Sequence, residues 1–394
     1  ARRGERPGAG PIAGRSFAIY NAAGRRVFVP PRRSRVQRVT RPEMRQSTVG
    51  KVMVLNAPRQ IGYEDYPDDP LPPDGVRIKT LYSGISAGTE MTQYRGTSPH
   101  LHKEWDVDAR LFLAGREASL SYPVRTWGYE QVGEVIEVGE AVTGVAPGAH
   151  VFGTWGHRTH HLANAEYALP RLMPPGLDPV LGIYSHIGAI ALNGVHDGRV
   201  RIGETAAVFG LGVVGQIVAQ AARRSGARVI AIDLHDSRLD MARALGADTT
   251  LNAAQVSVAE AIRDLTGGRG ADVCFEVTGS TRALNEAIRA AAYSARVVAM
   301  GFFQGEAQGL FLGEEFHHNR INVVCSQISG TDPELKYRWD KLRLWQSAIR
   351  LQADGLLDLR PLISHTAPFE RAAELYSLLD QAPEQVMQAV LEFS

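Results

Sequence analysis

Cysteine is scarce in this 394-residue sequence, which contains only Cys274 and Cys325 and no Cys-x-x-Cys pair. A structural disulfide is not expected, and a reducing cytoplasm is the setting we predict. Both cysteines lie in apolar runs typical of buried strands, so we expect both side chains to be buried. Long apolar runs are also missing. No run reaches the ~18 residues of a membrane-spanning helix and no signal-peptide core follows the basic start, so we expect no membrane association.

Acidic residues and lysine are nearly absent from residues 1–48, which contain 12 Arg, no Lys and only Glu5 and Glu43. This segment carries a net charge of +10, whereas the rest of the chain has 31 basic and 40 acidic residues. Because glycine and proline interrupt it and no apolar periodicity runs through it, we expect it to be disordered. It could be an arm for nucleic acid, a transit-like presequence, or an extension upstream of a start at Met44. We favour an extension without function, and therefore no nucleic-acid partner.

The remainder is long enough for two domains, with 44% hydrophobic and 22% charged residues over the whole chain. From Gly50 the sequence alternates as a strand does, and residues 75–82 form a second such run. Short strands with glycine at their turns continue to residue 152, which predicts an all-β module. A longer segment with aromatic residues, 91–126, interrupts this module, and we expect it to be a lid over the substrate.

A different pattern begins at Thr205. Residues 206–209 predict a strand, residues 216–224 a helix and residues 228–232 a second strand. The turn between strand and helix is Gly210-Leu211-Gly212-Val213-Val214-Gly215. In such a turn the first glycine allows the tight bend, the second lets backbone approach a pyrophosphate, and the third lets helix pack on strand. The N-terminus of the helix also attracts phosphate, so we predict a dinucleotide site here.

Asp233 ends the second strand of this unit. A carboxylate there accepts the ribose hydroxyls of NAD and repels the 2′-phosphate of NADP, so NAD is the cofactor we predict. Arg238 and His235 lie close enough downstream to soften that repulsion. Further strands are predicted at 272–277, 296–300 and 321–326, in a parallel sheet covered on both faces. Ligands bind at the carboxyl ends of such strands, so the cofactor groove should also include Thr278, Gly279, Gly301 and Phe302.

The combined motifs resemble the medium-chain dehydrogenase/reductase family over about residues 50–394. They are SGISAGTE (83–90), GYEQVGEVIEVGEAVTGVAPGAHVF (128–152), GLGVVG (210–215) and PLISHTAPFERAAELYSLL (361–379). The resemblance implies an α/β fold with a GroES-like β-rich catalytic domain at 49–185, completed by 328–394. A Rossmann domain with a doubly wound parallel sheet would occupy 186–327. The family's habit also implies a homodimer.

Zinc-dependent members of that family hold the metal through a cysteine in the first motif, the histidine of Gly-His-Glu, and a cysteine or glutamate before the cofactor domain. Those positions are Ser86, Tyr129 and His186 here. Neutral hydroxyl groups are poor zinc ligands, so we predict no metal. Together with ALNGV (191–195), the first motif resembles the zinc-less branch that includes bacteriochlorophyllide-type hydroxyethyl dehydrogenases.

Without zinc, side chains must handle the proton while the cofactor exchanges a hydride. We expect Tyr129 to donate to a substrate oxygen, with Ser86 and His186 completing a proton relay. Each residue also has a plainer interpretation: Tyr129 as a pocket wall, Ser86 as a turn residue and His186 as a buried, satisfied imidazole.

Glu90, Glu130 and His157 are the residues that we expect around the small-molecule substrate. His157, His160 and His161 are close in sequence, but no carboxylate or cysteine at matched spacing joins them as metal ligands. Aromatic and basic residues alternate in 329–356, which predicts a helix packing its aromatic face, a contact for an anionic or ring-shaped substrate, or an oligomer contact.

The predicted function is zinc-independent, NAD-dependent interconversion of a secondary alcohol and a ketone on a bulky metabolite. One alternative is an NADPH-dependent reductase of an activated C=C bond, against which Asp233 argues. The other is a dinucleotide-binding redox sensor without catalysis.

Overall fold

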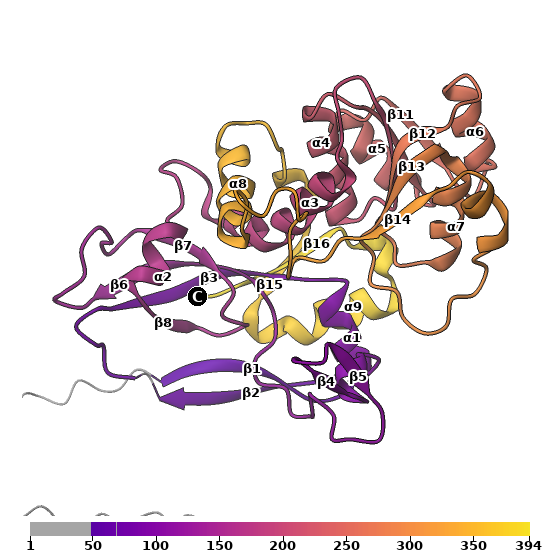
Figure 1. The fold of residues 1–394 in the computed structure, drawn as a ribbon. Helices are drawn as coiled ribbons and strands as arrows, with labels where there is room; N and C mark the ends of the chain where they lie inside the picture. The colour runs from indigo at the N-terminus through magenta and orange to yellow at the C-terminus, as the bar shows by residue number, and fades with distance from the viewer. Residues whose placement is uncertain (1–48, 68) are drawn as a thin grey trace, which may run out of the picture. The chain divides into compact units, whose positions relative to one another are not determined.

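The computed structural model describes residues 49–394 except Asp68, so the predictions for residues 1–48 lie outside the described residues. Two six-stranded sheets dominate this part of the chain (Figure 1). None of its helices is long and apolar enough to cross a membrane.

The β-rich sheet has the strand order β15-β16-β3-β6-β7, with β8 pairing to β3 as well. Strand β16 runs antiparallel to β3 and places Ala389 opposite Ile85, so the end of the chain completes a sheet that its beginning starts. A separate hairpin, β1-β2, lies beside it. The bounds are β1 Val49–Ala57, β2 Gln60–Pro67, β3 Gly75–Ile85, β6 Glu130–Val138, β7 His150–Gly153, β8 His160–Asn164, β15 Ile363–Pro368 and β16 Gln388–Glu392.

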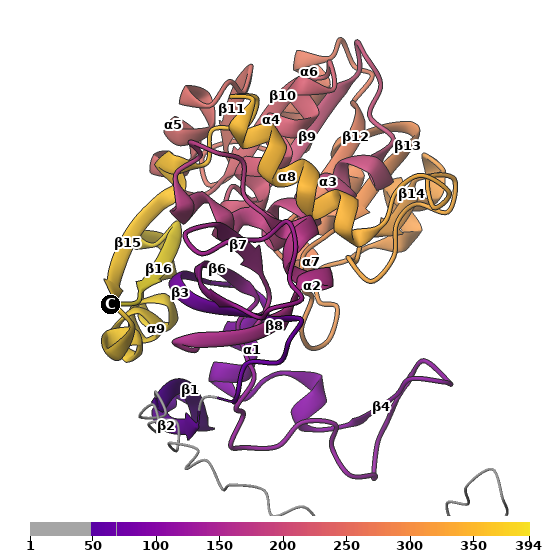
Figure 2. The same ribbon diagram turned by 90° about the vertical axis from the view of Figure 1, so that its left-hand side faces the viewer.

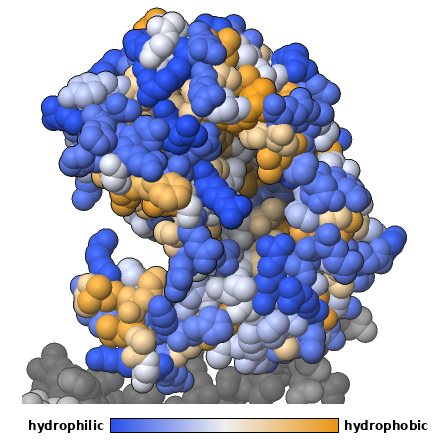
Figure 3. Space-filling view, turned by 90° about the vertical axis from the view of Figure 1, so that its right-hand side faces the viewer, coloured by the Kyte–Doolittle hydropathy of each residue, from blue (hydrophilic) through white to orange (hydrophobic). Residues whose placement is uncertain are grey.

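The segment 91–126 contains most of helix α1 (Thr89–Arg95) and a small hairpin of β4 (Glu104–Asp106) and β5 (Leu111–Leu113). The hairpin projects from the β-rich sheet in Figure 2, and hydrophobic side chains gather on it in Figure 3. Thr97 Oγ1, between α1 and the hairpin, donates to Gln304 Oε1 at 2.7 Å. The segment thus reaches the connection between β13 (Ala291–Ala299) and β14 (Asn322–Cys325), while its role as a lid stays a prediction.

The second sheet is entirely parallel, with the order β11-β10-β9-β12-β13-β14. This confirms the predicted doubly wound α/β fold, because the strand order reverses direction at β9. The bounds are β9 Thr205–Phe209, β10 Arg228–Asp233, β11 Thr249–Asn252, β12 Ala271–Glu276, β13 Ala291–Ala299 and β14 Asn322–Cys325.

Alternate side chains of β9 enter two different cores, as expected for a strand covered on both faces. Ala206 and Val208 pack with helices α3, α4 and α5, while Ala207 and Phe209 pack with α6 and α7. The helices are α2 Ala165–Ala168, α3 Tyr184–Gly198, α4 Val213–Arg224, α5 Asp236–Ala244, α6 Val258–Leu265, α7 Thr281–Ala290, α8 Lys341–Ala353 and α9 Ala372–Gln381.

The two cysteines differ in burial. Cys274 lies on β12 inside the sheet and is buried, as predicted. Cys325 is exposed, so the prediction of its burial is wrong. The physical reason is its place on β14, at the end of the strand order, where only one neighbouring strand covers it.

The turn after β9 depends on its glycines. Gly210 has φ +92°, a left-handed conformation that glycine adopts without strain. A Cβ on Gly215 would lie 1.8 Å from the carbonyl oxygen of Gly210, whereas a Cβ on Gly212 would meet nothing within 4 Å. Gly215 is therefore needed for packing, and Gly212 leaves open space beside the N-terminus of α4.

We predict that Gly215→Ala lowers the free energy of unfolding by about 1–3 kcal/mol, because the added methyl group overpacks the turn. Gly212→Ala is the matched control and should cost less. Urea unfolding followed by circular dichroism measures both variants, and equal losses would contradict the assignment of these two roles.

Candidate active site

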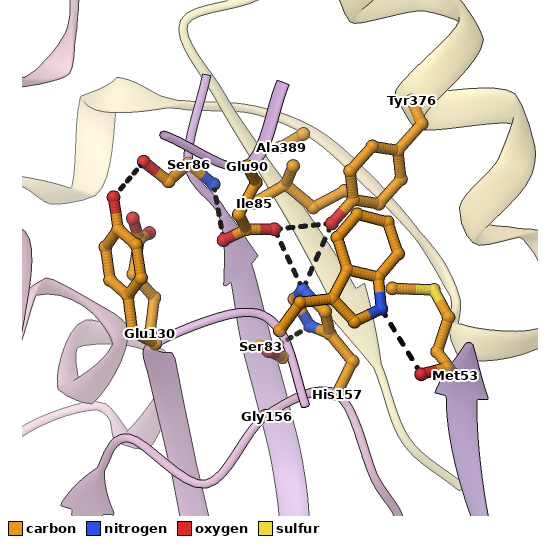
Figure 4. A network of polar contacts seen from close by, with 12 residues as sticks. Met53, Ser83, Ile85, Ser86, Glu90, Glu130, Gly156, His157, Tyr376 and Ala389 are labelled. Atoms are coloured by element: carbon orange, nitrogen blue, oxygen red, sulfur yellow. Dashed lines mark hydrogen bonds and ion pairs between the residues drawn. The ribbon is translucent and has the colours of Figure 1, made fainter. Parts of the chain in front are cut away.

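Polar side chains converge where β3 ends, α1 begins and β6 begins (Figure 4). Ser86 follows β3, and its hydroxyl forms a short hydrogen bond with the hydroxyl of Tyr129, which directly precedes β6. The backbone N–H of Ser86 donates to Glu90 Oε1 at 3.1 Å. A carboxylate on the first turn of α1 therefore fixes the loop that carries Ser86.

Glu90 lies at the centre of a buried network. Its Oε2 atom is 3.0 Å from His157 Nε2 and also accepts a hydrogen bond from the Tyr376 hydroxyl of α9. His157 Nδ1 is 2.7 Å from Ser83 Oγ, on the opposite edge of the imidazole (Figure 4). Both ring nitrogens of His157 and both oxygens of Glu90 thus have protein partners.

Glu90 and His157 lie inside the protein, and their contact with substrate stays a prediction. Each side chain belongs to a residue that is only 1% exposed, and the network just described surrounds both. Their place is beneath the Ser86 loop, where they support it. Sequence patterns missed Tyr376, since α9 lies far along the chain from α1.

Glu130 is fully buried but lacks comparable partners. Gln388 Nε2 lies 3.3 Å from its Oε2, while its Oε1 makes no hydrogen bond to any described residue. Burial, and next the charge of Glu90, raise the pKa of Glu130 well above its usual range. Because no cation of the described residues pairs with this carboxyl, burial favours its protonated form.

Burial also raises the pKa of Tyr129, and the charges of Glu130 and Glu90 add to this effect. Hydrogen bonds with Ser86 and Thr89 act in the opposite direction but do not outweigh it. The Tyr129 hydroxyl therefore stays protonated at neutral pH and is suited to donate a hydrogen bond. Thr89 was not predicted for the site, although it stands in the SGISAGTE motif beside Glu90.

His186, on the first turn of α3, meets the ring of Tyr129 edge-on with 4.8 Å between ring centres. Its Nδ1 atom lies 3.0 Å from Trp345 Nε1 of α8. Because an indole N–H can only donate, Nδ1 must accept, and the proton of the neutral imidazole is on Nε2. Burial, and next the charge of Lys341, lower the pKa of His186 to about 4, so the ring is neutral at pH 7.

The structure thus brings together Ser86, Tyr129 and His186, the three residues predicted to be catalytic. Two of their groups, the Tyr129 hydroxyl and the His186 Nε2–H, are suited to donate to one substrate oxygen. The catalytic roles themselves stay predictions.

The predicted cofactor residues collect at the carboxyl edge of the parallel sheet. Asp233 Oδ2 accepts from the backbone N–H of Leu211 at 2.7 Å, and Oδ1 accepts from the N–H groups of Leu234 and His235. Arg238 Nη1 is 3.9 Å from Asp233 Oδ2. The carboxylate that we expect to face ribose therefore also holds the glycine turn in place.

Thr278 and Gly279 form a second wall of this edge. Their N–H groups donate to the buried carboxylate of Glu276, at 2.8 and 3.2 Å. Gly301 packs against Gly279, because a Cβ on Gly301 would lie 2.1 Å from the Gly279 nitrogen. The Thr278 methyl group in turn lies beside Gly210. Glu276 was not predicted for the site. It is the last residue of the buried strand β12 and precedes Gly279 by three positions.

Zinc does not fit the residues present. Among residues 49–67 and 69–394, no three His, Cys, Asp or Glu side chains are arranged to hold a metal ion. Two of the three family positions carry neutral hydroxyls, and the imidazole at the third has its Nδ1 occupied by Trp345. Of the three neighbouring histidines, His157 is held by Glu90, and His161 stacks on Trp155 at 5.2 Å.

Comparison with known proteins agrees with this fold. The family model described as zinc-binding dehydrogenase matches residues 213–342. D-guloside 3-dehydrogenase of Escherichia coli (strain K12) is 32% identical over 351 residues, which covers 87% of this chain and 100% of that protein. The chain belongs to this family, the medium-chain dehydrogenases related to zinc-type alcohol dehydrogenase. It is accordingly an enzyme of the alcohol dehydrogenase type.

Solved structures show the same architecture. A zinc-binding dehydrogenase of Sinorhizobium meliloti 1021, bound to NADP, has a TM-score of 0.71 at 22% identity, covering 88% of this chain and 99% of that one. The 2R,3R-butanediol dehydrogenase of Bacillus subtilis has a TM-score of 0.70 at 21% identity, covering 87% and 99%. These likenesses show the fold.

Two histidines, the buried His186 and the half-buried His161, make stability depend on pH. Burial lowers the pKa of both His186 and His161 to about 4, from an ordinary value of 6.5. Between these values the unfolded chain binds more protons than the folded one. We therefore predict that the free energy of unfolding is highest above pH 6.5 and falls as the pH falls toward 4.

His161→Phe should flatten this dependence, because the substituted ring still stacks on Trp155 but cannot bind a proton. His318→Gln, at an exposed position, is the control and should leave the slope unchanged. Urea unfolding at several pH values measures the slope. An unchanged slope in His161→Phe would show that this imidazole is not held neutral by the fold.

Proposed function

We propose that the protein catalyses the NAD-dependent, zinc-independent interconversion of a secondary alcohol and a ketone on a hydroxylated metabolite. In the oxidative direction, the alcohol and NAD⁺ give the ketone, NADH and one proton. The observation that carries this proposal is the convergence of Ser86, Tyr129 and His186 at the positions where zinc-dependent members hold their metal. The relatives named for D-guloside and 2R,3R-butanediol support a hydroxylated substrate.

In this proposal, hydrogen-bond donors polarise the substrate oxygen in place of zinc. Tyr129 and the Nε2–H of His186 hold the substrate oxygen, and both strengthen their hold as negative charge develops on it during reduction of a ketone. Tyr129 supplies the proton to that oxygen and is reprotonated through Ser86. Thr89 also contacts the Tyr129 hydroxyl. When bound, the nicotinamide supplies or accepts the hydride.

NAD is favoured over NADP by the charge of Asp233. This carboxylate is 8% exposed and accepts hydrogen bonds from three backbone N–H groups, which hold it at the end of β10. Arg238, the nearest cation, has its Nη2 committed to the Pro383 carbonyl at 2.9 Å. A 2′-phosphate would therefore meet an acid before it meets a free cation.

The two alternatives have less support. An NADPH-dependent C=C reductase would leave the Tyr129 hydroxyl without a task and conflict with Asp233. A redox sensor without catalysis conflicts with membership of an enzyme family. Homodimer formation and a cytoplasmic location remain proposals from family habit and cysteine usage.

Replacing Tyr129 by Phe tests the proposed acid. We expect kcat for ketone reduction to fall by roughly 10²-fold or more, because a positioned general acid contributes about that much. The Kd for NADH should stay within about twofold, since the ring is retained. Tyr184→Phe is the matched control: its hydroxyl is buried and makes no hydrogen bond to the described residues, so kcat should not change. Equal activity of Tyr129→Phe and wild type would refute the role.

Titration of NADH and NADPH, with metal analysis of the same sample, tests cofactor and zinc together. We expect tighter NADH binding and no stoichiometric zinc. Asp233→Asn should reduce the preference for NADH by about tenfold, because it removes one repelling charge while keeping an oxygen for Leu211. A wild-type preference for NADPH would favour the C=C reductase, and one zinc per chain would contradict the metal-free site.

A further inference from the structure

Two cations flank the indole that orients His186. Lys341 Nζ lies 5.2 Å from the centre of the Trp345 ring, and the Arg171 guanidinium carbon lies 5.0 Å from it. Arg171 also stacks 4.0 Å above the Tyr167 ring. Gln346 Nε2, on α8, donates to the Pro170 carbonyl at 2.8 Å, which ties the segment of Arg171 to the helix of Lys341.

Neither cation has a counter-ion among the residues that the structure describes. Burial alone lowers the pKa of Lys341, and it is the main cause lowering the pKa of Arg171; no carboxylate contributes to either shift. Arg171 Nη1 donates to the Tyr167 carbonyl, but its buried Nε has no partner. Arg199, by comparison, forms an ion pair with Asp332 at 2.9 Å.

The acid nearest in sequence does not fill this role. Asp340 caps α8 by accepting from the backbone N–H of Arg343 at 2.7 Å, and it forms no ion pair with Lys341 within the described chain. Two cations that lie beside the same aromatic ring repel each other, and an anion bound near both offsets this repulsion. The site therefore has two positive charges and, at the Nε of the half-buried Arg171, a donor without a partner among the described residues, while Lys341 is exposed to a ligand from solvent; together these features favour an anionic ligand.

Its position links it to the proposed chemistry. Trp345 Nε1 donates to His186, and the charge of Lys341 is itself the second cause of the low pKa of His186. Only one indole thus separates the cations from the imidazole whose Nε2–H we assign to the substrate oxygen.

We propose that Lys341 and Arg171 form a subsite for an anionic group of the substrate, a carboxylate or a phosphate. The substrate class is then an acidic polyol, whose anion is bound beside Trp345 and whose secondary hydroxyl is oxidised at Tyr129 and His186. The assignment of the oxidised hydroxyl to Tyr129 and His186 rests on the proposed function, whereas the binding of an anion does not. The guanidinium offers paired donors to a planar or tetrahedral anion, and the ammonium offers a point charge.

Turnover of matched substrates tests the pairing. Sorbitol, gluconate and sorbitol 6-phosphate present a neutral polyol, a carboxylate and a phosphate. We expect kcat/KM for at least one anion to exceed that for sorbitol by tenfold or more, and the better anion identifies the group. Lys341→Gln should reduce this advantage in kcat/KM about tenfold, because it removes one charge-assisted contact. The kcat/KM for sorbitol should change by less than twofold.

Lys336→Gln, an exposed lysine shortly before α8, is the control and should change none of the three values. Equal use of sorbitol and both anions would overturn the subsite. A uniform loss on all three substrates in Lys341→Gln would overturn it as well.

Chemical labelling tests anion binding without turnover, so it separates failure of the subsite from failure of the proposed function. The chain has five lysines: Lys51, Lys79, Lys103, Lys336 and Lys341. Acetylation followed by mass spectrometry gives the rate at each. Saturating inorganic phosphate should slow labelling of Lys341 by threefold or more relative to chloride at equal ionic strength, and leave Lys336 unchanged. Equal rates at Lys341 in both salts would overturn the subsite whatever the turnover results.

Discussion

Two carboxylates, those of Glu90 and Glu130, are buried close together beneath the Ser86 loop, and the rest of the site depends on how each is compensated. Glu90 receives the Ser86 N–H, the Tyr376 hydroxyl and His157. Glu130 receives only the amide of Gln388, and its pKa rises accordingly. Hydrogen bonds thus satisfy both carboxylate oxygens of Glu90, whereas burial favours the neutral acid at Glu130. The same burial keeps the Tyr129 hydroxyl protonated, which suits it to donate.

The side chains that contact Glu90, Glu130 and His186 come from distant parts of the chain. Tyr376 lies on α9, Gln388 on β16 and Trp345 on α8, all beyond the parallel sheet in sequence. They reach the site because β16 pairs with β3 and because α8 packs on α3, where Gly188 lies against Ala348. The return of the chain therefore supplies residues that support the site, while the motifs near residues 86 and 129 supply the groups that we propose face substrate.

Short sequence motifs predicted the features that depend on residues close together in the sequence. The glycine turn at 210–215, the alternation of strands and helices after it, and the family likeness of Ser86 and Tyr129 all rest on short motifs. Burial of polar groups depends instead on pairings across the fold. The buried network around His157 was not predicted, because its partners, Glu90 and Tyr376, are 67 and 219 residues away. Cys325 was predicted as buried because an apolar run does not distinguish an edge strand from a central one.

The pairing of β16 with β3 also sets an order of assembly. Strands β9 to β14 lie within residues 205–325, so the parallel sheet has all its strands while the C-terminal segment is still being synthesised. Strand β3 is synthesised before these strands, but its partner β16, residues 388–392, follows them. In a nascent chain all strands of the parallel sheet are therefore present while β3 still exposes the edge that β16 later covers.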